Sequence, residues 1–93
     1  MLHAFVLIEA RPDRVAALCE ELAGIDGVTE VFSVTGGLAD IVAIVRVREH
    51  DMLSDVVSDR IARLSGITGT ETLIAFRAYS RRDLGLLWDI GID

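Results

Sequence analysis

The chain contains no lysine, one cysteine, one proline and five aromatic residues among its 93 residues. Its nine basic residues are all arginines and face fifteen acidic ones, so that the formal net charge is −6. A negative protein repels a phosphate backbone, and no cluster of basic residues with interleaved aromatic residues offsets that repulsion. We therefore expect no direct contact with nucleic acid.

Other absences narrow the class of protein further. The single cysteine, Cys19, excludes an internal disulfide, and its position on the apolar stripe of a predicted helix favours a buried thiol over a reactive one. No apolar run approaches the ~20 residues that a membrane helix needs. The start of the chain lacks the basic residues and cleavage site of a signal peptide. These features predict a cytoplasmic protein without a membrane partner.

Groups that could support catalysis or hold a metal are isolated. His3 and His50 lie far apart in the sequence, and neither has a partner at a metal-ligand or catalytic spacing. Cys19 has no identifiable histidine partner, and the GxSxG, P-loop and HExxH patterns are absent. The sequence therefore predicts no enzyme, no metal site and no cofactor.

The length and the apolar content indicate one domain that associates with itself. The apolar fraction is 52% and the mean hydropathy is +0.46, which is high for a small monomer with a large surface-to-volume ratio. Part of the apolar surface is therefore expected to face another copy of the chain.

A repeated pattern organises the chain. An amphipathic helix, a glycine-rich stop and a threonine-bearing strand occur at residues 22–29 and again at residues 64–68. Apolar and β-branched runs predict strands over residues 2–10, 28–34, 41–47 and 70–79. Between them, one helix is predicted from Pro12 to Gly24, and a second from its expected cap, Asp51, to Gly66.

The order β-α-β-β-α-β predicts an α+β, ferredoxin-like fold. Two right-handed crossovers around a central hairpin give a four-stranded antiparallel sheet with both helices on one face. The other face has no cover within the chain, although the strands are apolar on both sides, and a sheet-to-sheet dimer would bury it. Residues 1–80 form this domain. Residues 81–93 form an apolar tail that is expected to dock on the oligomer with Trp88 as its anchor, or else to complete the core of its own subunit.

Two polar turns are the candidate ligand contacts. The backbone N–H groups of the Gly36 and Gly37 turn suit a carboxylate, and Asp40, which follows it, suits an ammonium group or simply caps the turn. Thr70 and Thr72 point to one side of their predicted strand, while the residue between them points to the other.

These segments resemble a known family. Residues 34–43, with their Thr-Gly-Gly-Leu-Ala-Asp sequence, and residues 66–72 together look like the effector-binding (RAM) domain of the Lrp/AsnC, or feast/famine, transcriptional regulators. The resemblance extends from Ala4 to about Tyr79. Two details differ from the family pattern: the spacing from Gly36 to Asp40 is one residue longer, and Ala39 occupies a position that is usually aromatic.

The resemblance implies a sheet-to-sheet dimer that assembles further, often into an octamer, with an amino acid or similar effector bound between dimers. It also implies that Gly36, Gly37, Asp40, Thr70 and Thr72 form the ligand neighbourhood. The helix-turn-helix domain of family regulators is not found in this sequence. The chain thus looks like a stand-alone member that acts as a sensor or co-assembles with full-length Lrp/AsnC regulators.

Three alternatives remain at this point. Small ferredoxin-like dimers include monooxygenases and isomerases, which would need a polar cavity between sheet and helices, whereas the helix stripes here are apolar. An ACT-type regulatory domain shares the strand order, but the pattern at residues 66–72 argues against it. The third alternative is an oligomerisation module that binds no ligand.

Overall fold

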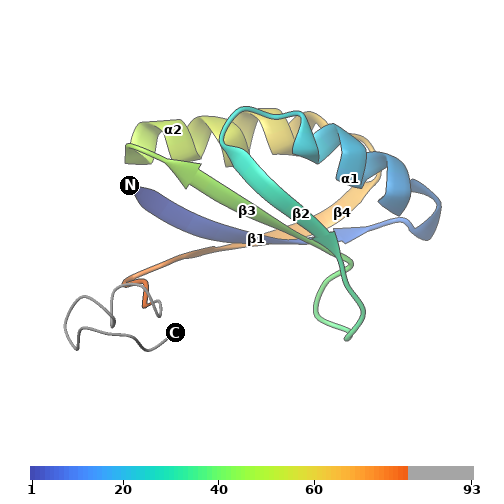
Figure 1. Ribbon diagram of the computed structural model, residues 1–93. Coiled ribbons are helices and arrows are strands. Elements are labelled where there is room, and N and C mark those ends of the chain that lie inside the picture. Colours follow the sequence, from blue (N-terminus) through green and yellow to red (C-terminus); the bar gives the residue numbers. More distant parts are fainter. Residues whose placement is uncertain (80–93) are drawn as a thin grey trace.

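The computed structural model describes residues 1–79, and the predicted tail at residues 81–93 lies outside the described residues (Figure 1). The elements along the chain are the strand β1 (Leu2–Ala10), the 3-10 turn η1 (Pro12–Arg14), the helix α1 (Val15–Ala23), the strands β2 (Val28–Ser33) and β3 (Ile41–Val47), the helix α2 (His50–Ser54), the π-helical segment η2 (Asp55–Arg60), the 3-10 turn η3 (Ile61–Arg63) and the strand β4 (Ile67–Ile74).

The four strands form one antiparallel sheet in the order β2-β3-β1-β4. Both helical segments cover the same face of this sheet (Figure 1). In the central pair, Leu2 faces Val47 at one end and Ile8 faces Ile41 at the other. The predicted ferredoxin-like fold is therefore confirmed, with the glycine-rich loop before β3 at the Ile8 end of the sheet.

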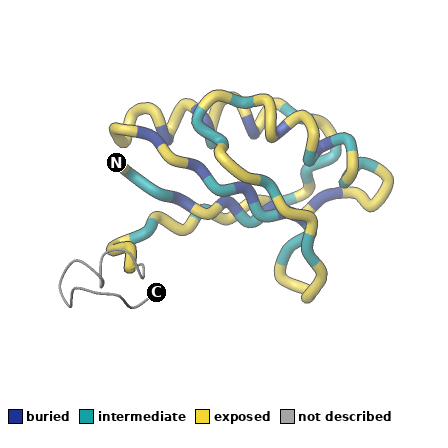
Figure 2. Tube along the Cα trace, in the orientation of Figure 1, coloured by how far each residue is buried: buried dark blue, intermediate teal, exposed yellow. Residues whose placement is uncertain are grey.

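The core lies between the sheet and the helices. Successive side chains of a strand point to opposite faces, and the fully buried residues alternate accordingly along the central strands (Figure 2). They are Ala4, Val6 and Ile8 of β1 and Ile41, Ala43 and Val45 of β3. Leu18 and Leu22 of α1 pack on them, as the predicted stripe requires, while Cys19 beside them is only partly buried.

The opposite face of the sheet, called here the open face, is apolar and uncovered by the described residues. Phe5 pairs with Leu73 and Ile44, and Phe32 pairs with Val42, all on this side. The exposed fractions of Phe5, Phe32 and Leu73 are 38%, 46% and 46%. The prediction that this face has no cover within the described chain is confirmed.

The second helix differs from the regular helix that the sequence predicts. Asp51 is not its cap, because Glu49 occupies that position without a side-chain bond and Asp51 lies in the first turn. The helix passes from α to π to 3-10 geometry, and its buried residues are Leu53, Val56 and Ile61. A π turn bonds residues five apart, so it keeps Val56 and Ile61 on the same side, facing the sheet.

The fourth strand does not have the bounds 70–79 that the sequence predicts, and the prediction is wrong at both ends. β4 begins at Ile67, which pairs with Ala10 beyond a bulge at Glu9. It ends at Ile74, and the N–H of Ala75 makes a last bond of 2.8 Å to the carbonyl of His3. Because β1 begins at Leu2, residues 77–79 have no residue of this strand opposite them.

Candidate functional site

Asp40 ends the glycine-rich loop and connects three strands. Its N–H donates to the carbonyl of Ile8 at 2.9 Å, and its carbonyl accepts from the N–H of Val34 at 2.9 Å. Its carboxylate oxygen Oδ2 accepts from the N–H of Ala10, also at 2.9 Å. The pairing of β1 with β3 ends at Ile8 and Ile41. The N–H of Ala10 lies beyond this last pair, so the carboxylate supplies the acceptor that β3 does not. One oxygen of Asp40 therefore has a structural role.

The tip of the same loop stands free of the body of the protein. Gly37 has φ +94°, a left-handed conformation that favours glycine. A Cβ atom at Gly36 or Gly37 would meet nothing within 4 Å, and Leu38 is 82% exposed. Figure 1 shows the loop projecting from the end of the sheet on the side away from the helices. The loop thus brings exposed backbone and Leu38 to the edge of the open face.

The two threonines lie on β4 as predicted. Thr70 pairs with Ile8 and Thr72 with Val6, whose side chains are both on the helix-covered face, whereas Glu71 pairs with Leu7 on the open face. Thr70 is exposed and Thr72 is half-buried. Both therefore point toward the helix layer, and of the two only Thr70, in the middle of β4, is freely accessible.

A small pocket of about 180 Å³ lies where β4, β1 and the glycine-rich loop meet. Its lining consists of Leu7, Glu9, Leu38, Gly69, Thr70 and Glu71. Of the five predicted ligand residues, only Thr70 belongs to this lining. Gly36 and Gly37 precede Leu38 in the loop, and Asp40 fixes the end of that loop. Thr72 lies outside the pocket.

Sequence reasoning missed the acidic character of this pocket. Glu9 pairs directly with Gly69, and the neighbouring pair on the same face is Leu7 with Glu71. A Cβ at Gly69 would lie 2.9 Å from Oε1 of Glu9, so this glycine leaves room for the glutamate side chain to cross the neighbouring strand. Strand alternation places Glu9 and Glu71 on one face, but the pairing register was needed to bring them together.

This arrangement suits a small ligand with an ammonium group. Within residues 1–79, neither Glu9 nor Glu71 takes part in a salt bridge. Carboxylates make strong charge-assisted hydrogen bonds to ammonium donors. Leu7 and Leu38 supply apolar contacts beside them. Thr70 also lines the pocket, although its side chain points to the helix-covered face. The pocket therefore combines the groups that recognise a short cationic or zwitterionic molecule.

Other reactive groups do not gather near the pocket. In the part of the chain that the structure describes, no three His, Cys, Asp or Glu side chains come together to hold a metal ion. Burial raises the pKa of the Cys19 thiol, because removal from water disfavours the thiolate. No helix within residues 1–79 has the length and apolar character needed to span a bilayer.

The chain is a small ferredoxin-like domain with a polar pocket at one end of its sheet, and comparison with known proteins identifies its family. Residues 3–84 match the Lrp/AsnC ligand binding domain, so the chain belongs to that family. An uncharacterized HTH-type transcriptional regulator from Pyrococcus abyssi is 37% identical over 71 residues, which are 76% of this chain and 44% of the regulator. The chain thus spans less than half the length of this relative.

Solved structures show the same relationship. TTHA0845 from Thermus thermophilus is 52% identical, with a TM-score of 0.81 over 87% of this chain and 100% of that one. AsnC from E. coli is 28% identical, with a TM-score of 0.76 over 83% of this chain and 52% of that one. A feast or famine regulatory protein from M. tuberculosis, complexed with L-methionine, is 31% identical, with a TM-score of 0.68 over 88% of this chain and 55% of that one.

Proposed function

We propose that this chain is a non-catalytic module that binds an amino acid or similar small effector in the pocket between β4 and the glycine-rich loop. The observation behind the proposal is the meeting of Glu9, Glu71, Thr70 and Leu38 in one small cavity beside both sequence motifs of the family. The related M. tuberculosis protein has been crystallised with L-methionine, which supports an amino acid as the class of ligand.

The chemistry of the pocket suggests how such a ligand lies in it. The ammonium group faces Glu9 and Glu71, and an apolar side chain packs against Leu7 and Leu38. A cavity of about 180 Å³ is well below the ~300 Å³ at which pockets for drug-sized molecules begin. Within the single chain, this volume suits a molecule comparable with a single amino acid. The ligand carboxylate binds exposed N–H groups of the loop at Gly36 and Gly37.

The open face supports self-association as part of the same function. Phe5, Phe32 and Leu73 leave a contiguous apolar surface exposed on the isolated chain, and such surfaces mark interaction sites. A sheet-to-sheet dimer covers this face, and further assembly, up to an octamer, would complete the effector pocket. In the cytoplasm the module would act as a sensor, or would join full-length Lrp/AsnC regulators and change their response to the effector.

Catalysis is the less favoured function because the space between the sheet and the helices is apolar. The buried residues of the described chain include no polar or charged side chain, whereas a ferredoxin-like enzyme with its site in that layer would need polar groups there. An ACT-type role would require oligomerisation through sheet edges, which the exposed apolar face does not favour.

Thermal-shift and calorimetric titration of the whole chain against the amino acids tests the proposal. At least one compound should bind, and Glu71→Gln should weaken its binding by about tenfold, the typical value of one charge-assisted hydrogen bond. Glu20→Gln, on the exposed side of α1, is the matched control and should bind normally. If no amino acid binds at millimolar concentration, the sensor function is wrong. If Glu71→Gln and Glu20→Gln bind the ligand equally well, the ligand does not bind in this pocket.

Co-purification tests whether the chain assembles with full-length Lrp/AsnC regulators. A tagged form of the chain, mixed with a full-length family regulator from the same cell, should give mixed oligomers that are separable from both homo-oligomers by mass. If only homo-oligomers form with every family member of that cell, the proposed co-assembly is wrong, while effector binding by the chain itself is unaffected.

A further inference from the structure

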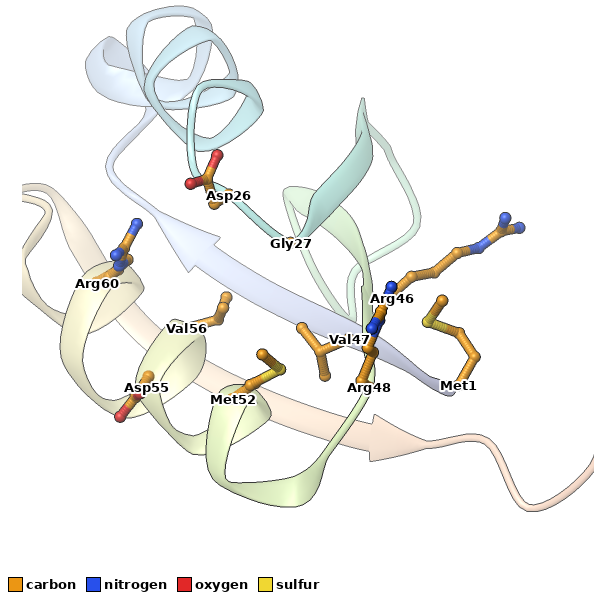
Figure 3. A pocket seen from close by; sticks show the side chains of 10 residues that line it. All are labelled: Met1, Asp26, Gly27, Arg46, Val47, Arg48, Met52, Asp55, Val56 and Arg60. Carbon is orange, nitrogen blue, oxygen red and sulfur yellow. The ribbon is translucent and has the colours of Figure 1, made fainter.

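A second and larger cavity lies on the helix-covered side of the molecule, at the end of the sheet opposite the glycine-rich loop. Its volume is about 430 Å³, and it is called here the helix-side pocket. Gly27 in the loop before β2, Val47 at the end of β3, Arg48 after it, Met52 of α2, and Val56 and Arg60 of η2 are among its lining residues (Figure 3). It shares no residue with the pocket proposed for the effector.

The floor of the helix-side pocket is apolar. Val47 and Val56 are 8% and 5% exposed, and Met52 is 45% exposed at the rim. Figure 3 shows the side chains of Val47, Met52 and Val56 directed into the gap between the second helix and β3. Gly27 forms one wall with φ +97°, and a Cβ there would lie only 3.1 Å from Val47 and 3.2 Å from Val56. The glycine therefore lets the loop lie directly against the apolar floor.

The rim carries arginines that have no ion-pair partner within residues 1–79. In that part of the chain Arg11, Arg14 and Arg63 each form a salt bridge with a carboxylate. The described arginines that form none are Arg46, Arg48, Arg60 and Arg77. Arg46, Arg48 and Arg60 line the helix-side pocket. Positive charge without a salt-bridge partner in residues 1–79 therefore gathers at this pocket, although the net charge of the chain is −6.

The carboxylates at this pocket do not cancel that charge. Asp26 and Asp55 also line it, but Asp55 points away from the gap in Figure 3, as does Arg46. Arg48, Arg60 and Asp26 remain around the opening. A guanidinium group presents its donors in a planar fork that matches a carboxylate. Figure 3 shows Arg48 and Arg60 on opposite sides of the opening, so one carboxylate pairs with one of them. Arg60 belongs to the same segment as Val56 on the floor, and an anionic ligand group fits there.

The local helix geometry places these groups. Residues 55–60 form a π-helical segment within the second helix, and Val56 and Arg60 both belong to it. π-helical turns are rare in proteins and occur frequently at functional sites. Here the π turn sets Val56 on the floor and Arg60 at the opening, on the same side of the helix. The π-helical segment therefore forms part of the wall of the helix-side pocket.

From these observations we propose that the helix-side pocket is a second ligand site, which binds a small organic carboxylate with a short aliphatic chain. The carboxylate lies at Arg60, and the aliphatic chain covers Val47, Met52 and Val56. This site is independent of the effector pocket, so that one chain carries two ligands of opposite character, one held by carboxylates and the other by an arginine.

Titration of the isotope-labelled whole chain with hexanoate, followed by amide NMR shifts, tests the proposal. Hexanoate should bind with a Kd of about 1 mM or tighter, as expected for a fragment of this size. The amide shifts should centre on Gly27, Val47 and Val56, and not on Gly69 to Glu71. Hexanol, which lacks the charge, and inorganic phosphate, which lacks the chain, should each bind at least about tenfold more weakly.

Two variants and a control separate the contacts from effects on folding. Arg60→Gln, at an exposed position, should weaken hexanoate binding about tenfold. Arg63→Gln, which removes a neighbouring arginine that does not line the pocket, should not. Met52→Trp should block binding by filling the opening while leaving both arginines in place.

Several results would overturn the proposal. They are the absence of shifts with hexanoate at about 10 mM, shifts centred on Gly69 to Glu71, equal binding of hexanol or phosphate, or unchanged hexanoate binding by Arg60→Gln. Shifts centred on Gly69 to Glu71 would place hexanoate in the effector pocket instead. The other three results leave the proposed effector pocket unaffected.

Discussion

The carboxylate of Asp40 provides the sharpest test of how the glycine-rich loop is held. Asp40→Ala removes the acceptor of the 2.9 Å bond from the N–H of Ala10. A hydrogen bond to a charged group contributes about 1.5–3 kcal/mol. Because this one is only part-buried and water can replace some of it, we expect a loss of about 1–2 kcal/mol in the free energy of unfolding.

Urea unfolding and thermal denaturation measure this loss. For a chain of this length, a loss of about 1–2 kcal/mol corresponds to a fall in Tm of about 5–15 °C. Asp40→Asn keeps a carbonyl oxygen at the same place and should retain at least about half of the stability that Asp40→Ala loses. Asp26→Ala is the control for charge, since no hydrogen bond to its side chain exists within residues 1–79. All variants must be compared at one protomer concentration, because assembly shifts Tm.

Two outcomes would refute this reasoning about Asp40. In the first, Asp40→Ala loses no more stability than Asp26→Ala, so the bond to Ala10 contributes nothing. In the second, Asp40→Asn and Asp40→Ala are equally unstable, so the acceptor oxygen is not what matters. If Asp40→Asn keeps its stability and loses effector binding, the other carboxylate oxygen contacts the ligand as well.

Three further predictions concern the backbone, the open face and the thiol. Gly66→Ala should destabilise the chain by about 1–3 kcal/mol, because Gly66 has φ +96° and its new Cβ would lie 2.7 Å from a side-chain carbon of Arg14. Gly24→Ala, where a Cβ meets nothing closer than 3.6 Å, should be neutral or stabilising, and urea titration that finds the two equal would contradict the argument. Leu73→Asp should convert a sheet-to-sheet dimer into folded monomers, since this residue is 46% exposed on the open face. Sedimentation experiments measure the mass, and an unchanged mass would show that the chain associates through another surface. Burial raises the pKa of the Cys19 thiol, so a smaller fraction of it is thiolate at about pH 8 than in a free thiol. A thiol reagent should therefore react more slowly with the folded chain than with the chain unfolded in urea. Equal reaction rates would show that the thiol is unperturbed.

Local sequence patterns correctly predicted those helices and strands that depend on interactions between residues close together in the sequence. The apolar runs at residues 2–10 and 41–47 indicated both central strands with the observed bounds. The stripe of α1 was also predictable, because Leu18 and Leu22 lie four residues apart and reach the same face. The alternation of Thr70 and Thr72 against Glu71 followed from strand geometry alone.

The errors came from features that depend on distant partners. β4 ends at Ile74, where only His3 and Leu2 of β1 remain beyond the last pair, and the apolar residues after Ile74 could not indicate that limit. The π turn in the second helix arises from packing of Val56 and Ile61 against the sheet, since the sequence there is equally compatible with an α-helix. The acidic pocket depends on a register that places Glu9 opposite Gly69.

The order of elements, the ferredoxin-like fold, the family, the glycine-rich turn and the threonine-bearing strand could all be read from the amino-acid sequence. These follow from periodicity, glycine positions and short motifs, which act within a few residues along the chain. The folded chain was needed to show that Asp40 bonds to Ala10 and that Glu9 and Glu71 meet beside Leu38. It was also needed to show that Arg48 and Arg60, which form no ion pair in residues 1–79, lie at a second cavity. Strand register and helix packing join residues far apart in the sequence, and no local pattern encodes those distances.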